Sequence, residues 1–147
     1  METLPLEIGE TAHALRKAFD RRAAVLGVTR AQWKVLFHLS RTPGLRQVEL
    51  ADLLDVEPIT LCRIVDRLEE SELVERSQDP DDRRARKLHV TARAQPLIEK
   101  LQAHAAELAN EAFAGIDPAD VQTTRAALAR VRENVGRSSP ANRALGQ

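Results

Sequence analysis

The sequence predicts a mostly α-helical fold that carries one small β-hairpin, and three observations lead to it. Apolar residues recur every three or four positions over most of the chain, which is the spacing of one helix face. The exception is residues 73–91, where two short β-compatible runs flank a cluster of turn residues. The length of 147 residues corresponds to about one domain and is sufficient for a hydrophobic core.

The composition excludes several classes of protein. Hydrophobic residues make up 43% and charged residues 30%, as in globular chains. No apolar run reaches the roughly 18 residues of a membrane span, and no signal peptide follows Met1. We therefore expect a cytoplasmic protein with no membrane partner. The single cysteine, Cys62, excludes an internal disulfide, and we expect no metal and no cofactor.

The N-terminal helices are marked by their end signals. An apolar stripe predicts a helix over residues 5–26, and Gly27 can end it in a left-handed conformation. Thr29 and Gln32 match a capping box, in which each side chain bonds the other residue's amide. The box predicts a second helix that runs to about Ser40.

The C-terminal half is marked in the same way. Thr91 can cap a long helix that Gly115 ends. Asp117 and the proline after it predict the start of a last helix, which we expect Gly136 to stop. Residues 137–147 show no periodicity and are predicted to be a flexible tail.

Residues 47–66 are typical of two short helices joined by a tight turn. Ala51 is small where the helices must cross, and Asp55 is among the few residue types that tolerate a left-handed turn position. Pro58 fits the first turn of the second helix. The pattern predicts a helix-turn-helix, although a purely structural helix pair has similar spacing. Its second helix has a predicted buried stripe of Leu61, Ile64, Val65 and Leu68.

The opposite face of that second helix suits DNA. Thr60, Arg63 and Arg67 lie together away from the buried stripe, at spacings of three and four. A hydroxyl and two guanidinium groups can contact phosphates and base edges. Gln47, at the start of the first helix of the pair, belongs to the same predicted DNA-binding surface.

The predicted hairpin pairs residues 73–76 with residues 87–90 and is strongly basic after its turn. Residues 83–93 contain five basic side chains and no acid, although net charge over the chain is zero. A charged run is often only a solvated surface. A helix-turn-helix followed by a hairpin is, however, a winged helix, whose arginines can enter a minor groove. We therefore predict a winged helix-turn-helix DNA-binding domain over 27–91, with Arg83, Arg84 and Arg86 on the wing.

The run from Val56 to Thr91 resembles the MarR family of bacterial transcription regulators, in particular its SlyA-like branch. Its most specific part is Asp79-Pro80-x-Asp82-Arg83-Arg84, and the resemblance extends over about residues 26–101. The resemblance implies that Arg63 reads the major groove, that Arg84 enters the minor groove, and that Asp82 supports the wing. Cys62 stands where the family commonly has a small polar residue.

The chain ends are predicted to form a helical dimerisation region, residues 1–26 and 92–136. Apolar residues there are not needed by the winged helix, although they could simply pack on their own domain. The resemblance implies a homodimer built from these ends, which would bind a palindromic operator as a repressor or anti-repressor. The candidate dimer residues are Leu4, Leu6, Ile8, Leu128, Val131 and Val135.

The resemblance also implies a small aromatic or phenolic ligand. Trp33 and Phe37, with His38 beside them, are candidates to line its pocket, although an aromatic pair at helical spacing is usually core. Two alternative functions stay open: a winged-helix protein-interaction module, and a thiol-based redox regulator using Cys62. We do not expect an enzyme, because no nucleophile–base pair or phosphate-binding loop is present.

Overall fold

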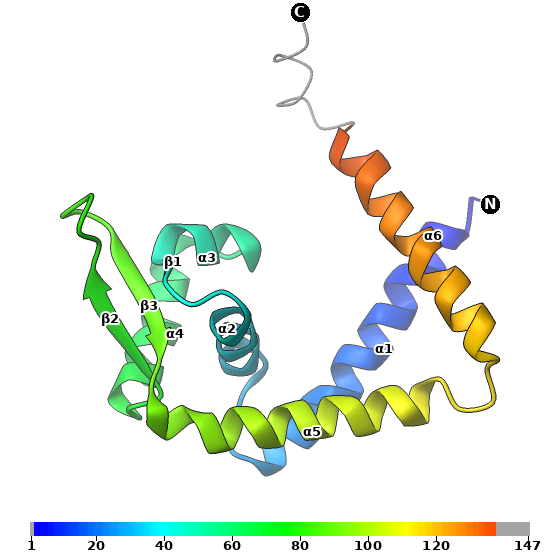
Figure 1. Ribbon diagram of the computed structural model, residues 1–147, viewed down its shortest axis with the longest axis horizontal. Coiled ribbons are helices and arrows are strands. Elements are labelled where there is room, and N and C mark those ends of the chain that lie inside the picture. The colour runs from blue at the N-terminus through cyan, green and yellow to red at the C-terminus, as the bar shows by residue number, and fades with distance from the viewer. Residues whose placement is uncertain (1, 138–147) are drawn as a thin grey trace, which may run out of the picture. The chain divides into compact units, whose positions relative to one another are not determined.

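The computed structural model describes residues 2–137 and has a mostly α-helical fold with one small antiparallel sheet, as predicted (Figure 1). The chain divides into two compact units, residues 1–108 and 109–147. The elements of the described part are α1 (Leu4–Val25), α2 (Arg30–Arg41), β1 (Leu45–Arg46), α3 (Gln47–Leu53), α4 (Pro58–Glu70), β2 (Val74–Gln78), β3 (Arg86–Val90), a 3-10 turn (Ala92–Ala94), α5 (Gln95–Ala112) and α6 (Pro118–Arg137).

The predicted end signals of α1 and α2 are confirmed. Gly27 follows α1 with φ +75°, a conformation that costs glycine little. The Thr29 hydroxyl accepts a hydrogen bond from the Gln32 amide at 3.3 Å, and the Gln32 side chain accepts one from the Thr29 amide at 3.1 Å. The capping box therefore fixes where α2 begins.

The sheet has the strand order β1-β3-β2, and both pairings are antiparallel. The hairpin of β2 and β3 was predicted; its strands are slightly longer than expected, with Val74 opposite Val90 and Gln78 opposite Arg86. The third strand, β1, was not predicted. It has two residues, too few for a periodic pattern, and it forms because β3 offers it an open edge: Leu45 pairs with Leu88.

One hydrophobic core lies within the first unit and joins its helices to the sheet. Of the predicted α4 stripe, Leu61, Val65 and Leu68 are buried and Ile64 is half-buried. Because α4 and β3 both contribute side chains to this core, packing fixes the position of α4 relative to the wing. Its buried residues are Phe19, Ala23, Val28, Val35, Leu36, Leu39, Leu50, Ala51, Leu61, Val65, Leu68, Val74, Leu88, Ala94, Ile98 and Leu101.

The second unit contains the end of α5 and all of α6. Asp117 begins α6 as predicted, its carboxylate accepting a hydrogen bond from the Ala119 amide at 2.8 Å. Gly136 does not stop the helix, contrary to expectation: α6 continues through it to Arg137. A helical glycine costs only about 1 kcal/mol relative to alanine, which neighbouring turns can offset. Arg137, which was predicted to begin the tail, is therefore helical, and the rest of the predicted tail, residues 138–147, lies outside the described residues.

Candidate nucleic-acid interface

The helix-turn-helix geometry is built around one left-handed residue. Asp55, between α3 and α4, has φ +52°, which aspartate tolerates better than most residues. The next residue, Val56, donates its amide to the carbonyl of Ala51 at 3.1 Å. Ala51 is buried at the crossing, and Pro58 begins α4 as predicted. The turn therefore places α4 with its apolar stripe inward and its polar face outward.

The structure brings together the three predicted residues of α4. Thr60, Arg63 and Arg67 are all exposed. They line a shallow groove of about 180 Å³ together with the first turn of α2. The capping box occupies the Gln32 and Thr29 amides, but the start of a helix keeps a partial positive charge. The groove therefore combines a hydroxyl, two guanidinium groups and a helix N-terminus, all of which favour anions.

Among the exposed apolar side chains of the helix-turn-helix, Ile59 and Val48 were not predicted from the sequence. Ile59 on α4 is 64% exposed and Val48 on α3 is 63% exposed. Neither belongs to the core, and an exposed branched side chain can contact the methyl group of thymine. The signal available in the sequence was the position of Ile59 in the turn before Arg63, off the buried stripe.

The base of the wing is fastened by an ion pair that the sequence did not reveal. Asp79 is 1% exposed, and its Oδ2 lies 2.8 Å from Nη2 and 2.9 Å from Nε of Arg46 on β1. Its Oδ1 accepts a hydrogen bond from the Asp81 amide at 2.9 Å. That hydrogen bond, Arg46 and the charge of Lys87 together hold the pKa of Asp79 below its ordinary value, against the effect of burial. In the sequence, Asp79 was singled out only as the first residue of the motif that carries the resemblance.

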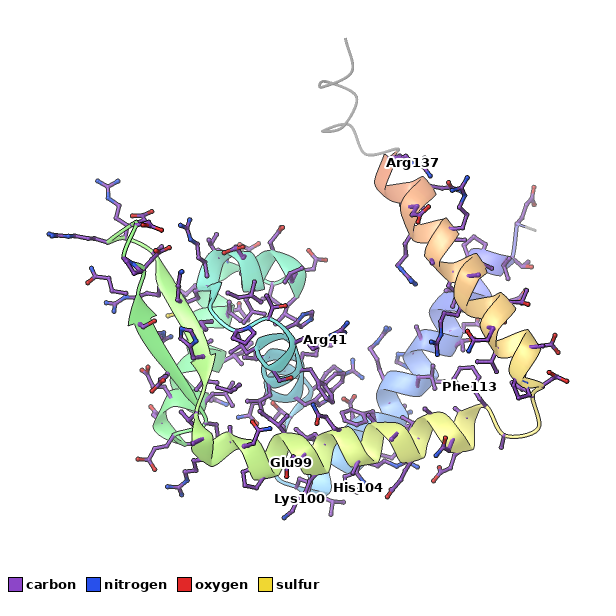
Figure 2. The ribbon with its side chains drawn as sticks, in the orientation of Figure 1. Arg41, Glu99, Lys100, His104, Phe113 and Arg137 are labelled. Carbon is purple, nitrogen blue, oxygen red and sulfur yellow. The ribbon has the colours of Figure 1, made fainter. Side chains whose placement is uncertain are left out.

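The wing tip is shaped by Asp82, the residue expected to support it. Its Oδ1 accepts a hydrogen bond from the Arg84 amide at 3.0 Å, and its carbonyl accepts one from the Ala85 amide at 3.1 Å. Asp82 therefore folds the tip, while Arg83, Arg84 and Arg86 are exposed. Side chains at this tip extend away from the sheet (Figure 2).

A second groove, of about 190 Å³, lies between the wing and the start of α3. It is lined by the predicted residues Gln47, Arg84 and Arg86, together with Arg46. The predicted DNA-binding residues therefore form two groups: one against the start of α2, and one between the wing and α3. Arg83 lines neither groove.

The candidate ligand residues Trp33 and Phe37 are half-buried and pack against the core. Their ring centroids lie 5.6 Å apart, and those of Phe19 lie 4.8 Å and 5.7 Å from them. The Trp33 indole also donates a hydrogen bond to Asp20 Oδ1 at 2.9 Å. His38 is half-buried, and burial together with the charges of Arg41 and Lys34 lowers its pKa.

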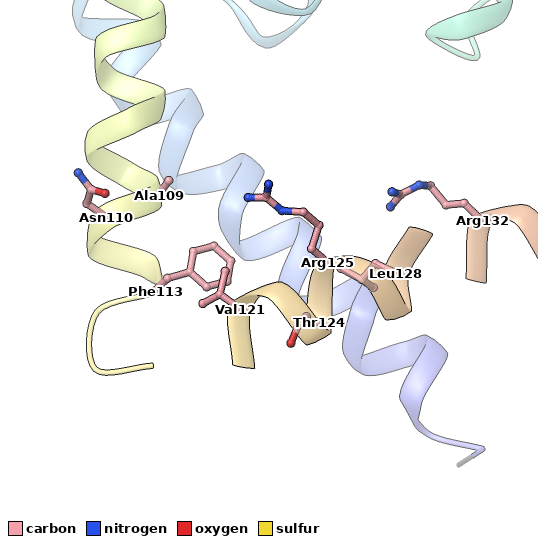
Figure 3. Close-up of a pocket in the computed structure, with 8 residues that line it drawn as sticks. All are labelled: Ala109, Asn110, Phe113, Val121, Thr124, Arg125, Leu128 and Arg132. Carbon is pink, nitrogen blue, oxygen red and sulfur yellow. The ribbon is translucent and has the colours of Figure 1, made fainter. Parts of the chain in front are cut away.

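The second unit has a groove of about 400 Å³ between the end of α5 and α6 (Figure 3). Phe113, Val121 and Leu128 form its apolar lining, with Arg125 and Arg132 beside them. Of the other candidate dimer residues on α6, Val131 is 46% and Val135 is 68% exposed.

The candidate dimer residues of α1 are also largely uncovered in the single chain. Leu4 and Leu6 are exposed, and Ile8 is half-buried.

Within residues 2–137, no helix has the length and apolar character to cross a membrane. The same residues contain no cluster of histidine, cysteine and carboxylate side chains that could hold a metal.

Comparison with known proteins agrees with this geometry. Residues 28–85 match the MarR family. The crystal structure of transcriptional regulator PA3341 is 36% identical, covers 90% of this chain and 98% of its own, and has a TM-score of 0.82. A crystal structure of MarR is 30% identical, with coverage of 91% and 98% and a TM-score of 0.76. The transcriptional regulator SlyA is 25% identical, with coverage of 90% and 93% and a TM-score of 0.78. The SlyA-like branch stays a prediction.

Proposed function

Because this chain belongs to the MarR family of transcriptional regulators, we propose that it binds a palindromic operator as a homodimer and acts as a repressor or anti-repressor. The observation that carries the proposal is the clustering of exposed cations. A chain with no net charge places Arg63 and Arg67 on α4, and Arg84 and Arg86 on the wing. Such a local basic surface is what binding to the DNA backbone requires.

The two arginine groups are proposed to have different roles. Arg63 lies on the face of α4 opposite the buried stripe and would enter the major groove, where a bidentate pair with guanine gives about 1–3 kcal/mol of discrimination. Ile59, one turn earlier, would contact a thymine methyl group. Arg84 at the wing tip would enter the minor groove and respond to its width.

The proposed dimer is supported by the apolar surface at the chain ends. Leu4, Leu6, Val131 and Val135 are exposed in the single chain, and an apolar groove runs beside Leu128. A second copy of the chain would remove these surfaces from water. Sedimentation should give about 33 kDa, twice the chain mass of 16.3 kDa. A monomer at micromolar concentration would contradict this part of the proposal.

Release by a small aromatic or phenolic ligand is the third part. Its support is the half-buried His38 beside Phe37, which could exchange a hydrogen bond with a phenol. Trp33 is the single tryptophan, and the chain has no tyrosine, so its fluorescence reports on this region. Titration with a panel of benzoates and phenols should change that emission and release DNA. No change across the panel would contradict it.

DNA binding itself is tested by selection from a pool of randomised duplexes. The wild-type protein should enrich a two-fold symmetric sequence, and its affinity should fall steeply with salt. Failure to enrich any sequence, with weak binding to all duplexes, would favour a winged-helix protein-interaction module instead.

A further inference from the structure

Arg76 on β2 connects the wing to both helices of the helix-turn-helix. Its side chain is 15% exposed. Nε donates to Gln47 Oε1 on α3 at 3.1 Å, and Nη2 donates to the carbonyl of Cys62 on α4 at 3.0 Å. Nη1 is paired with Asp66 at 2.7 Å and with Glu69 at 3.1 Å. All three nitrogens of one guanidinium group therefore hold α3, α4 and β2 together.

Arg76 keeps its charge in this setting. Burial by itself would lower the pKa of Arg76, but the hydrogen bond and charge of Asp66 and the charge of Glu69 raise it above the ordinary value. A rigid planar fork presents donors from three separate nitrogens to acceptors on different elements. A lysine ammonium also has three donors, but they share one nitrogen and cannot replace contacts made separately by Nε, Nη1 and Nη2.

The contact with Arg76 decides which way the Gln47 amide faces. A guanidinium group has only donors, so the atom of Gln47 that faces it must be the carbonyl oxygen. The Nε2 amine of Gln47 is then left to act as a donor. Adenine recognition by glutamine uses both the oxygen and the amine. Because the Gln47 oxygen already accepts a hydrogen bond from the charged Arg76, a contact made through the amine alone is favoured.

Gln47 also lines the groove between the wing and α3, together with Arg84 and Arg86. The polar side chains that line this groove are all donors or cations, and Val48, Pro58 and Ala85 form its apolar part. The chemistry that fits such a lining is an anion with several acceptor oxygens, as a DNA phosphate has. If the Gln47 amine contacted a base edge, that contact would not require the three arginines beside it, Arg46, Arg84 and Arg86.

We propose that Arg76 is a positioning residue for DNA reading: it locks α4 to the wing and holds Gln47 as a hydrogen-bond donor to a backbone phosphate. The inference rests on the proposed DNA-binding function. It adds that Gln47 contacts the backbone and not a base, and that an arginine outside the DNA-contacting surface controls selectivity.

The test uses the full chain and two probes: the duplex that the wild type enriches from a randomised pool, and a scrambled duplex of the same composition. Gln47→Glu keeps an acceptor for Arg76 but replaces the donor by a negative charge. It should melt like wild type and bind both duplexes about tenfold more weakly, the loss of one hydrogen bond plus repulsion.

Arg76→Lys cannot hold Gln47 and the Cys62 carbonyl together, so α4 and the wing lose their fixed spacing. The ratio of affinities for the enriched and scrambled duplexes should fall about tenfold, each mismatched contact being worth about 1–3 kcal/mol. Arg93→Lys is the matched control: Arg93 is also ion-paired, with Glu72, but is 71% exposed and lies outside both grooves. It should leave both affinities unchanged.

Each outcome decides a specific point. Gln47→Glu binding like wild type, or losing affinity only for the enriched duplex, would overturn the phosphate contact. Arg76→Lys that is less stable but keeps the wild-type affinity ratio would show a merely structural role and overturn the positioning. If Arg76→Lys does not fold, Gln47→Glu decides the proposal alone. A wild type that enriches no duplex refutes the proposed function instead, a result distinct from these.

Discussion

The contact between α1 and α2 offers a prediction whose size follows from the structure. Asp20 on α1 accepts a hydrogen bond from the Trp33 indole at 2.9 Å and one from Arg30 Nε at 2.7 Å. Asp20→Ala removes both and leaves the half-buried indole N–H without this partner. A hydrogen bond to a charged group contributes about 1.5–3 kcal/mol. Because the Asp20 side chain is 25% exposed, we expect the lower part of that range, about 1.5–2 kcal/mol of unfolding free energy.

Asp20→Asn separates the two contacts. The amide oxygen can still accept from Trp33, whereas the ion pair with Arg30 is lost. That pair is partly exposed to solvent, where ion pairs contribute little, so the loss should be about 1 kcal/mol or less. Asp52→Ala is the control, since Asp52 is exposed on α3 and should change stability by less than about 0.5 kcal/mol.

The assay is urea unfolding followed by circular dichroism and by the emission of Trp33, the single tryptophan. The native emission itself should change in Asp20→Ala but not in Asp52→Ala.

The pH dependence has a definite sign. The Arg30 hydrogen bond, assisted by Trp33, lowers the pKa of Asp20 against the effect of burial. The stability from Asp20 is therefore present above the unfolded pKa, near 3.9, and is lost as the pH falls through the lower folded value. The difference between wild type and Asp20→Ala should be constant from about pH 5 to 8 and shrink below about pH 4. Equal urea midpoints for wild type and Asp20→Ala at pH 7 would refute the reasoning.

Three further predictions concern DNA binding. Arg63→Ala should lower the preference for the enriched duplex by about 1–3 kcal/mol, whereas Arg84→Ala should weaken binding to all duplexes and reduce the salt slope by about one. Both effects are measured by titrating the duplexes across a salt series. If both variants bind like wild type, neither α4 nor the wing contacts DNA as proposed. Ile59→Ala should relax selection at one thymine by about 1 kcal/mol while leaving the melting temperature unchanged, as seen by repeating the selection. Cys62→Ser should bind DNA as wild type does with or without peroxide; release of wild type alone by peroxide would establish the thiol-based switch instead.

Local features of this fold could be predicted because their causes lie within a few residues. The capping box of Thr29 and Gln32 is a contact across three positions, and the left-handed turn at Asp55 depends on the residue type at one position. The exposed face of α4 follows from the helical period once the buried stripe is known. Gly136 shows the limit of such reasoning, because a glycine near a helix end permits a stop without requiring one.

Only the tertiary structure decided which distant residues meet. Asp79 is paired with Arg46, 33 positions earlier, and Arg76 with Gln47, 29 positions earlier. Each pair exists because β1 and β2 flank β3, and strand β1 has no pattern of its own. From the sequence alone, a charged side chain is predicted to be exposed to solvent. Only the fold shows whether it has a buried partner. The sequence by itself therefore determined which arginines of α4 and of the wing are exposed, whereas the fold determined what holds those elements in place, because periodicity is a local property and ion pairing across a sheet is not.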